Sequence, residues 1–312
     1  MSRYLVTGGC GFIGSNLVNA LLKGGHEVRV LDDLSSGKRE SIPDHVSFIE
    51  ADVADRPKVS DAFDNVDGCF HLAADPSVSR SLEDYIGSHR TNLGGTISVL
   101  DSASRESKKR QVYVPVVYAS SCAVYGSSGA TPLSETSPAD PLSSYGADKL
   151  SGEIHARMAS TAYGVPSVGL RFFNVYGPGQ LPASTYSGVL SIFCKKLIAG
   201  ERVSIFGDGE QRRDFVFVED VVNHIWQAMI RMPEISPRVY NVCTGRGISL
   251  LGVGRLIAKI CNTSFDPIFA EERPGDIRFS VGDPQAGIAA LGLAASISLE
   301  DGLVRTLDWL RA

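Results

Sequence analysis

Four glycines punctuate the segment Thr7-Gly8-Gly9-Cys10-Gly11-Phe12-Ile13-Gly14 near the start of the 312-residue chain. An apolar, strand-like run precedes this segment, and a helical pattern follows it. Gly8 permits a tight turn, Gly11 lets the backbone approach a pyrophosphate, and Gly14 lets the helix pack closely on the strand. The N–H groups at the start of the helix then favour an anion. We therefore expect a dinucleotide-binding loop here; the alternative is a plain strand–turn–helix that binds no nucleotide.

Two acidic residues beyond this loop indicate which dinucleotide binds. Asp32 ends the second strand-like run, about 20 residues further on, where a carboxylate accepts hydrogen bonds from the adenosine ribose. Its charge would repel a 2′-phosphate, which favours NAD over NADP. Asp52 follows the third run and is placed to meet the adenine amino group; the alternative for Asp52 is an exposed surface acid.

Strand-like and helical patterns alternate through the first half of the chain. This alternation predicts an α/β fold in which helices cover both faces of a parallel sheet, a Rossmann-type doubly wound architecture. In such folds ligands bind beyond the carboxyl ends of the strands. We expect strands at Arg3–Thr7, Glu27–Leu31, Val46–Glu50, Cys69–Ala73, Pro115–Ser120 and Ser167–Phe173, and helices at Ile13–Lys23, Thr91–Ser107 and Tyr145–Tyr163.

The character of the sequence changes after Asn174. Gly, Pro and Ser are frequent in Val175–Gly188, which predicts a mobile loop over a site. We expect residues 1–170 to form an NAD-binding domain, with a return to its sheet near residues 214–245. Residues 171–312 should form mainly a smaller mixed α/β substrate-binding domain. Further strands are expected at Val203–Phe206, Phe215–Val218 and Val239–Val242, and further helices at Val221–Ile230, Gly252–Ile260 and Leu299–Leu310.

A tyrosine and a lysine stand one helical turn apart in the chain. At this spacing Lys149 lies on the same helix face as Tyr145 and supplies a positive charge close to the phenol. A phenol acts as a base near neutral pH only if its pKa falls from about 10 to about 7, which requires roughly 4 kcal/mol. We expect Lys149 and the positive nicotinamide ring of an oxidised cofactor to supply this stabilisation. Ser121, at the end of an apolar run, is the third candidate catalytic residue.

The composition limits the partners and the compartment. The net charge of −5 and the pI near 5.7 give no electrostatic reason to expect nucleic acid or an anionic membrane as partner. The six cysteines lack Cys-x-x-Cys spacing and metal-ligand spacing with the histidines, so we expect reduced core thiols and no metal site. The first strand begins almost at Met1, and no apolar run reaches bilayer-spanning length. We therefore expect a cytoplasmic enzyme.

Further motifs follow the glycine loop along the chain. They are Leu31-Asp32-Asp33-Leu34-Ser35-Ser36-Gly37, His71-Leu72-Ala73-Ala74, Tyr118-Ala119-Ser120-Ser121-Cys122-Ala123-Val124-Tyr125-Gly126, Tyr145-Gly146-Ala147-Asp148-Lys149, Leu170-Arg171-Phe172-Phe173-Asn174-Val175-Tyr176-Gly177-Pro178, Arg213-Asp214-Phe215 and Arg273-Pro274-Gly275-Asp276. With these motifs the chain resembles, over nearly its whole length, the extended short-chain dehydrogenase/reductase family and, within it, the nucleotide-sugar 4-epimerases.

The resemblance implies a role for each member of the catalytic trio. Ser121 would hydrogen-bond the sugar 4-hydroxyl, Tyr145 would act as the base, and Lys149 would hold the nicotinamide ribose. The family also pairs two helices of each subunit into a homodimer interface, here those expected at Thr91–Ser107 and Tyr145–Tyr163. The alternative is that these two helices only pack on the sheet.

The resemblance also implies the residues that bind each ligand. Those implied for NAD are Gly8, Gly11, Phe12, Ile13, Gly14, Asp32, Ser36, Gly37, Asp52, Val53, Leu72, Ala73, Ala74, Asn92, Tyr145, Lys149 and Phe172. Those implied for a UDP-sugar are Val78, Ser121, Ala123, Tyr145, Asn174, Val189, Ser204, Phe206, Arg213, Arg273, Asp276 and Ser280. Among them, Asn174 and Arg213 would contact the diphosphate and Asp276 the ribose. The alternative for Arg213 is a surface arginine.

The residues after Ser121 separate the reactions found in the family. The 4,6-dehydratases, and the decarboxylases that make UDP-pentoses, carry Asp-Glu or Glu there, an acid that moves a proton at C5 or assists loss of carbon dioxide. Here these places hold Cys122 and Ala123; alanine has no acidic proton, and a thiol has a pKa of about 8.5. We therefore expect 4-epimerisation through a 4-keto sugar. Cys122 as a catalytic group of a 3,5-epimerase is an alternative to a packing cysteine.

Three features indicate the sugar. Asn174 stands where uronic-acid epimerases usually carry threonine, and Ser184–Leu190 resembles a loop of UDP-N-acetylhexosamine epimerases. Ser280 aligns with a size gate at which small residues admit an N-acetyl group; the alternative is a serine away from the sugar. We expect UDP-GlcNAc and UDP-GalNAc to be substrates as well as UDP-glucose and UDP-galactose.

Other readings of the chain stay open at this point. A 4-ketoreductase, a uronic-acid 4-epimerase and a dehydratase are the alternative enzymes. A regulator built on an inactive scaffold is disfavoured, because both Tyr145 and Lys149 are present.

Overall fold

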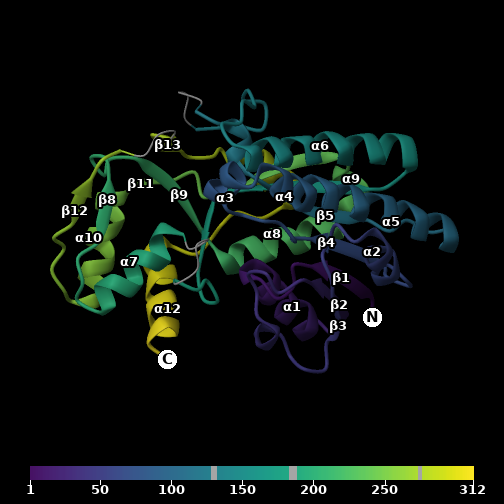
Figure 1. Cartoon of the computed structure of the whole chain (residues 1–312), viewed down its shortest axis with the longest axis horizontal. Helices are drawn as coiled ribbons and strands as arrows, with labels where there is room; N and C mark the ends of the chain where they lie inside the picture. The colour runs from purple at the N-terminus through teal and green to yellow at the C-terminus, as the bar shows by residue number, and fades with distance from the viewer. Residues whose placement is uncertain (128–131, 183–187, 273–275) are drawn as a thin grey trace.

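Seven strands form the central sheet of the computed structural model, which describes residues 1–127, 132–182, 188–272 and 276–312 (Figure 1). The strand order is β10-β6-β5-β4-β1-β2-β3, and every neighbouring pair is parallel. The order reverses between β1 and β4, which places a ligand crevice at the carboxyl ends of these strands. The expected Rossmann-type doubly wound fold is confirmed.

The elements have the following bounds. The strands are β1 (Arg3–Thr7), β2 (Glu27–Asp32), β3 (Ser47–Glu50), β4 (Gly68–His71), β5 (Val116–Ser121), β6 (Ser167–Phe172), β7 (Asn174–Tyr176), β8 (Ser204–Phe206), β9 (Arg212–Phe217), β10 (Arg238–Val242), β11 (Gly247–Ser249), β12 (Ile268–Ala270) and β13 (Phe279–Ser280). The α-helices are α1 (Phe12–Lys23), α2 (Arg56–Ala62), α3 (Val78–Glu83), α4 (Tyr85–His89), α5 (Gly95–Arg110), α6 (Ser144–Tyr163), α7 (Val189–Ile198), α8 (Val218–Ile230), α9 (Met232–Ile235), α10 (Leu250–Cys261), α11 (Gln285–Leu291) and α12 (Leu299–Arg311). Short helical turns occur at η1 (Arg39–Ser41), η2 (Arg90–Gly94) and η3 (Cys122–Tyr125).

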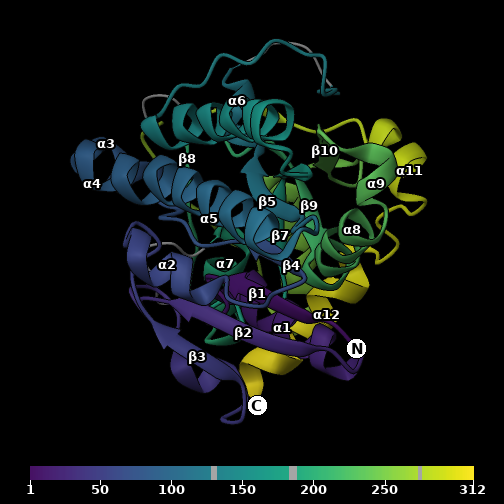
Figure 2. The same cartoon turned by 90° about the vertical axis from the view of Figure 1, so that its right-hand side faces the viewer.

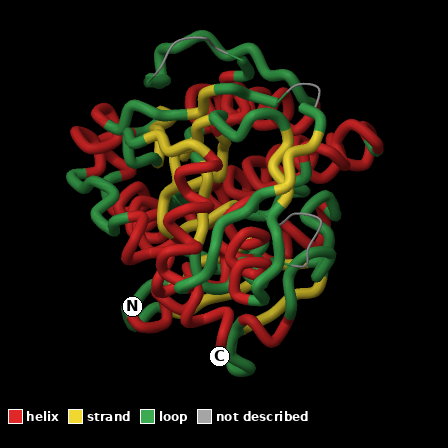
Figure 3. The backbone as a smooth tube through the Cα atoms, turned by 90° about the vertical axis from the view of Figure 1, so that its left-hand side faces the viewer, coloured by secondary structure: helices red, strands yellow, loops and turns green. Residues whose placement is uncertain are grey.

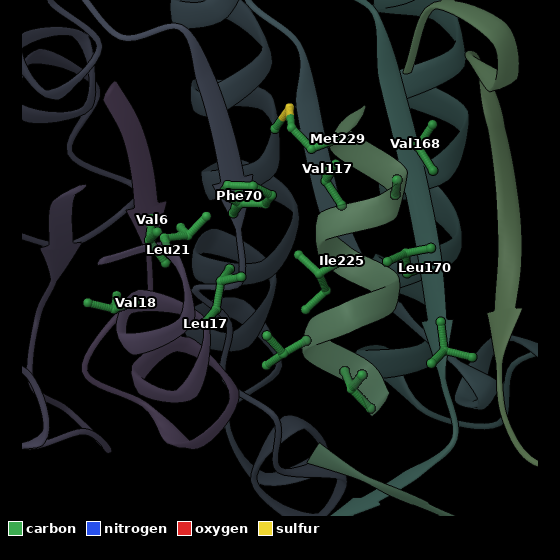
Figure 4. Close-up of a cluster of buried hydrophobic side chains, with 14 of the residues drawn as sticks. Val6, Leu17, Val18, Leu21, Phe70, Val117, Val168, Leu170, Ile225 and Met229 are labelled. Atoms are coloured by element: carbon green, nitrogen blue, oxygen red, sulfur yellow. The ribbon is translucent and has the colours of Figure 1, made fainter. Parts of the chain in front are cut away.

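Helices cover both faces of the sheet (Figure 2). On one face α1 and α8 pack against it, and Leu17, Leu21 and Ile225 meet Val117 and Leu170 there (Figure 4). On the other face lies a separate core built from α2, α5 and α6. Each fully buried leucine or isoleucine contributes about 1.5–3 kcal/mol of transfer free energy, so both faces stabilise the sheet that carries the ligand crevice.

Apart from the cores on the two faces of the sheet, a further hydrophobic core, called the second core below, begins where β6 ends. Strand β7 starts two residues later and pairs with β9, which also pairs with β11 and β13. Helices α7, α10 and α12 bury Phe193, Val253 and Leu303 in this core. The two chain termini lie in the lower half of Figure 3. Among the described residues, no helix is long and apolar enough to cross a membrane.

The structure corrects the expected loop at Val175–Gly188. Val175 and Tyr176 belong to β7, because they pair with Val216 and Phe217 of β9. Residues 183–187 of the expected loop lie outside the described residues. The return segment places α8 on the same face of the sheet as α1, and it places β10 at the edge of the seven-stranded sheet. The division of the chain near residue 170 stays a prediction.

Candidate active site and cofactor cleft

The glycine loop brings backbone against backbone between β1 and α1. At Gly8 (φ +69°) an added Cβ would lie 2.6 Å from the nitrogen of Ala73, and at Gly14 it would lie 2.0 Å from the carbonyl oxygen of Gly8. A side chain at either glycine would therefore push neighbouring backbone away. Gly11 is the N-cap of α1 and has no side chain with which to cap the first N–H groups of the helix. This arrangement suits the phosphates of a dinucleotide.

A cleft of about 860 Å³ connects the glycine loop with the catalytic trio. Its volume lies within the usual range of ligand sites, roughly 300–1,000 Å³. The residues predicted to bind NAD that line it are Gly8, Gly11, Phe12, Ile13, Gly14, Asp32, Ser36, Gly37, Asp52, Val53, Leu72, Ala73, Ala74, Tyr145, Lys149 and Phe172. A phosphate-binding loop at one side and an acid at the end of β2 fit this dinucleotide.

Asn92 is the one predicted NAD residue that does not line the described cleft. Its buried side-chain amide accepts a hydrogen bond from the N–H of Asp75 (2.8 Å) and donates one to the carbonyl of the same residue (3.2 Å). Asp75 itself lines the cleft. Asn92 therefore acts on the cleft through the backbone that it holds.

The two acids predicted to bind the adenosine are already engaged with the protein. Asp32 accepts hydrogen bonds from the N–H groups of Cys10 and Leu34, both at 2.9 Å, and burial raises its pKa. Asp32 thus ties the glycine loop to the end of β2. Asp52 forms an ion pair with Arg90 at 2.9 Å, and Arg90 also lines the cleft. A guanidinium therefore lies beside the acid predicted to meet the adenine.

Strand β5 and helix α6 bring the catalytic trio into the wall of the cleft. Ser121 is the last residue of β5, and Tyr145 lies in the first turn of α6, whose N-cap is Ser143. The Nζ atom of Lys149 lies 5.7 Å from the centre of the Tyr145 ring and donates to the carbonyl of Ala119 at 2.9 Å. A serine hydroxyl, a phenol and an ammonium group are therefore presented together to one ligand.

Burial opposes the charged forms of both titratable members of the trio. Burial raises the pKa of Tyr145 to about 12, although a hydrogen bond with Ser121 lowers it. Burial lowers the pKa of Lys149 to about 8, although the nearby Asp148 raises it. Lys149 alone therefore does not lower the Tyr145 pKa; the expectation combined its charge with that of the nicotinamide ring. A second positive charge beside the ring would be needed to favour the phenolate.

His71 is a buried, neutral residue at the end of β4, next to the cleft residue Leu72. Its Nδ1 atom lies 2.8 Å from the hydroxyl of Thr7, and its Nε2 atom lies 3.1 Å from the hydroxyl of Thr96. Burial, and then the charge of Lys149, lower the His71 pKa to about 3. His71 therefore links β1, β4 and α5 without adding charge.

The predicted size gate lies next to the catalytic serine. Ser280, in β13, is buried, and its hydroxyl lies 3.7 Å from the Sγ atom of Cys122. Ala123 donates its N–H to the hydroxyl of Ser121 at 3.1 Å. Ser280 thus contacts the residue that follows Ser121, although neither Ser280 nor Ala123 lines a described pocket.

The residues predicted to bind the UDP part contact one another. Arg213 pairs with Asp276 at 2.6 Å and donates to the carbonyl of Ile277 at 2.5 Å, and its side chain is 15% exposed. Arg213 is therefore not a free surface arginine. Asn174 donates to the carbonyl of Asp214 at 3.2 Å. A smaller pocket of about 110 Å³ adjoins this group and is lined by Phe206, Gly207, Asp208, Gln211, Glu272, Asp276, Ile277 and Arg278.

The remaining predicted substrate residues have diverse positions. Ser204 starts β8, pairs with Ile268 and lines neither described pocket. Val189 starts α7 and is half-buried. Val78 starts α3, but its side chain lies outside the described residues, as do Arg273 and residues 184–187 of the loop compared with N-acetylhexosamine epimerases.

A buried polar network beneath the catalytic serine was not predicted. Ser120 donates to Glu153 at 2.5 Å, and the same carboxylate accepts two hydrogen bonds from Arg171 at 2.8 and 2.7 Å. The network ties α6 and β5, which carry the trio, to β6. Its one visible signal in the sequence is the spacing of Glu153, one helical turn after Lys149.

Comparison with known proteins identifies the family. The model of the NAD dependent epimerase/dehydratase family matches residues 4–243 of this chain. The chain belongs to this family. The expected family and the use of NAD are thereby confirmed.

Members of the epimerase/dehydratase family resemble the chain along its whole length. A UDP-glucose 4-epimerase of Mycolicibacterium smegmatis is 36% identical, with 99% of this chain and 98% of the relative covered. A dTDP-glucose 4,6-dehydratase of Streptomyces niveus is 32% identical, with 99% and 93% covered. The structure of the UDP-glucose 4-epimerase of Thermotoga maritima with UDP-glucose is 35% identical, with a TM-score of 0.93 and 99% and 98% covered. The chain is thus a nucleotide-sugar enzyme of this family, while similarity alone does not select the reaction.

Proposed function

We propose that the protein interconverts the C4 epimers of UDP-hexoses and UDP-N-acetylhexosamines, with NAD held in the cleft. One observation carries the proposal: Ser121, Tyr145 and Lys149 meet in the wall of the NAD cleft, and the serine is followed by Cys122 and Ala123 instead of an acid. The similarity to the UDP-glucose 4-epimerases of M. smegmatis and T. maritima supports the same reaction.

The trio supplies the proton chemistry that such a reaction needs. Tyr145, as phenolate, would take the proton of the sugar 4-hydroxyl through the hydroxyl of Ser121, and would return it at the end. Lys149 would hold the nicotinamide ribose, and its charge would favour the phenolate. When bound, NAD supplies hydride chemistry at C4, with the hydride returned to the other face of the sugar. No net oxidation results, so cofactor turnover is not required.

The substrate side is suited to a tight grip on the diphosphate and a loose one on the sugar. Arg213 and Asn174 offer a guanidinium and an amide, donors that suit phosphate oxygens. Arg213 is held in place by Asp276. Small side chains at Ser280 and Cys122 leave the sugar room to turn and to carry an N-acetyl group.

Elimination of water is disfavoured by the group that follows the catalytic serine. Burial raises the pKa of the Cys122 thiol, so this group is neutral at physiological pH and a weak base. A dehydratase needs an efficient acid–base group for the proton at C5. The buried thiol does not meet this need.

We also propose a homodimer that pairs α5 and α6 of two copies. Ile97 on α5 and Ile154 and Met158 on α6 are 41%, 51% and 42% exposed, so both of these neighbouring helices carry apolar side chains that a second copy could cover. Light scattering of the purified protein tests the proposal. A mass of one chain at micromolar concentration would contradict it.

Proton NMR tests the proposed reaction. The purified protein is incubated with UDP-GlcNAc, UDP-glucose, UDP-glucuronic acid or dTDP-glucose, without and with added NAD, and the anomeric signals are followed. Appearance of the C4 epimer of UDP-glucose or UDP-GlcNAc supports the proposal. A 4-keto-6-deoxy product from dTDP-glucose would instead indicate a dehydratase, and conversion of UDP-glucuronic acid alone would indicate a uronic-acid epimerase.

A further inference from the structure

The C-terminal helix α12 reaches the NAD cleft through one residue. Leu303 and Leu307 of this helix are fully buried in the second hydrophobic core. Trp309, two residues further on, is half-buried and lines the same cleft as Gly11 and Asp32. The cleft is therefore not built by the first part of the chain alone, because an indole from the far end of the sequence forms part of its wall.

One face of α12 leads directly to this position. Gly302, Arg305 and Trp309 follow one another at spacings of three and four, so they share a helix face. A Cβ at Gly302 would lie 2.1 Å from the hydroxyl of Tyr176, and the guanidinium of Arg305 lies 4.6 Å from the ring centre of Phe217. This face is thus pressed against β7 and β9, and Trp309 extends it by one turn toward the cleft.

A carboxylate of α8, the helix that covers one face of the central sheet, holds the residues just before α12. Asp220 accepts hydrogen bonds from the N–H groups of Ser296 (3.1 Å) and Ile297 (3.0 Å). Ser298 then caps α12 by accepting the N–H of Asp301 at 3.1 Å. These bonds set the direction in which the helix leaves α8, and hence the place of the indole. In Figure 1, α12 and α1 lie at a similar height in the lower part of the view.

Residues that follow β7 form the neighbouring part of the same wall. Asn16 of α1 donates to the carbonyl of Pro178 at 3.1 Å. Gln180 donates to the carbonyl of Val175 at 3.2 Å and accepts from the hydroxyl of Ser191 at 2.5 Å. Asn16, Pro178 and Gln180 all line the cleft, as Trp309 does. The segment that follows β7 therefore contacts α1 at Asn16, in the helix whose N-terminus would face the diphosphate of NAD.

We propose that Trp309 closes the outer wall of the NAD cleft and slows the release of bound NAD. Tryptophan is suited to this task, because its large rigid ring excludes water from a ligand at a low cost in side-chain entropy. The proposal requires NAD binding, but it does not require the proposed epimerisation. Its test can therefore fail or succeed independently of the sugar chemistry.

The release rate of NAD tests the role of Trp309. Native protein and the variants Trp309→Ala and Val304→Ala are loaded with radiolabelled NAD and chased with excess unlabelled NAD, and retained label is followed by filter binding. We expect Trp309→Ala to release NAD about tenfold faster, the effect of losing about 1.4 kcal/mol of contact. Val304 is 39% exposed on the same helix and does not line the cleft, so Val304→Ala should match the native protein.

Two results of this experiment would overturn the proposal. One is release from Trp309→Ala within about twofold of the native rate, which is less than the effect of one ordinary contact. The other is equally fast release from Val304→Ala, since general loosening of α12 would then explain the effect.

A second measurement keeps the native indole in place. The chain has two tryptophans, and Trp226 packs in an aromatic cluster with Tyr4, His26 and Phe70. In Trp226→Phe all tryptophan emission therefore comes from Trp309. We expect saturating NAD to reduce quenching of this emission by acrylamide at least about twofold, because the indole would lie against the ligand. Unchanged quenching with NAD bound, as measured by retained label, would refute the contact.

Discussion

The NAD cleft and the sugar side of the site are built by the chain in different ways. Nearly all residues that line the cleft precede residue 174, and they come from strand ends and the helix starts that follow them. The proposed sugar side instead joins Cys122 to Ser280 and Arg213 to Asp276. The first region is local enough to be recognised from spacing, whereas the second depends on how a separate core folds back onto the sheet.

Tyr145→Phe should separate chemistry from cofactor binding most sharply. The variant lacks the hydroxyl that exchanges the proton, while the ring still fills its place in the cleft wall. We expect kcat to fall by roughly 10³-fold, within the range of lost general acid–base catalysis, with retained NAD unchanged. Turnover of UDP-glucose by NMR and NAD in an acid extract measure the two quantities. A native rate would remove Tyr145 from the chemistry.

Gly14→Ala should weaken NAD binding in the cleft and leave the proposed sugar-binding residues in place. Its Cβ would meet the carbonyl oxygen of Gly8 at 2.0 Å, which displaces the start of α1 from the phosphates. We expect NAD affinity to fall about 100-fold, equivalent to about 2.7 kcal/mol, as measured by calorimetry. Gly94→Ala is the matched control, because the nearest atom to its Cβ would be 4.0 Å away. Equal affinities of the two variants would contradict this account of the loop.

His71 makes the stability of the cleft region depend on pH. Its pKa is about 3 in the folded protein, whereas an unperturbed histidine has a pKa of about 6.5. The unfolded chain therefore binds the extra proton first as pH falls below 6.5, and stability is lost in that direction. From pH 7 to pH 5 this group should cost about 2 kcal/mol.

Urea unfolding at pH 7 and pH 5 measures this dependence. His71→Gln should show a smaller loss of unfolding free energy than the native protein between these pH values. The exposed His45 supplies the control, and His45→Gln should keep the native pH dependence. A native dependence in His71→Gln would show that His71 is not the responsible group.

Ser280→Tyr should produce the smallest effect, and it acts on the sugar side alone. Ser280 is buried beside Cys122, so under the proposed function a tyrosine ring there would narrow the space for the sugar. We expect the rate with UDP-GlcNAc to fall about tenfold relative to that with UDP-glucose, the usual size of such steric discrimination, in a paired NMR assay. Ser204→Tyr is the control, because Ser204 is exposed in β8 whereas Ser280 is buried beside Cys122. An unchanged rate ratio in Ser280→Tyr would place the gate elsewhere.

The same contrast explains what the sequence could predict. The pattern of apolar residues and the glycines of the turn predicted β1, the glycine loop and α1. The spacing of four residues on one helix predicted the approach of Lys149 to Tyr145. The raised pKa of Tyr145 could not be predicted from spacing, because burial depends on every element packed around the ring. The pairing of Arg213 with Asp276 and the arrival of Trp309 at the cleft depend on how the elements of the second core pack together, which no local pattern specifies. Val175 was predicted to lie in a loop but belongs to β7. Its partner in β9, Val216, lies 41 positions further along the chain, so no local pattern indicated the pairing.

The position of α8 has a consequence for the growing polypeptide during translation. A nascent chain that ends at Phe172 already contains the catalytic trio and the glycine loop. Val117, Val168 and Leu170 of its sheet are nevertheless uncovered, because α8, which packs on them, ends at Ile230. At 5–20 residues per second the ribosome needs about 3–12 s to add this segment. During that interval the apolar face is available to chaperones, and a fragment cut near residue 172 should aggregate instead of binding NAD.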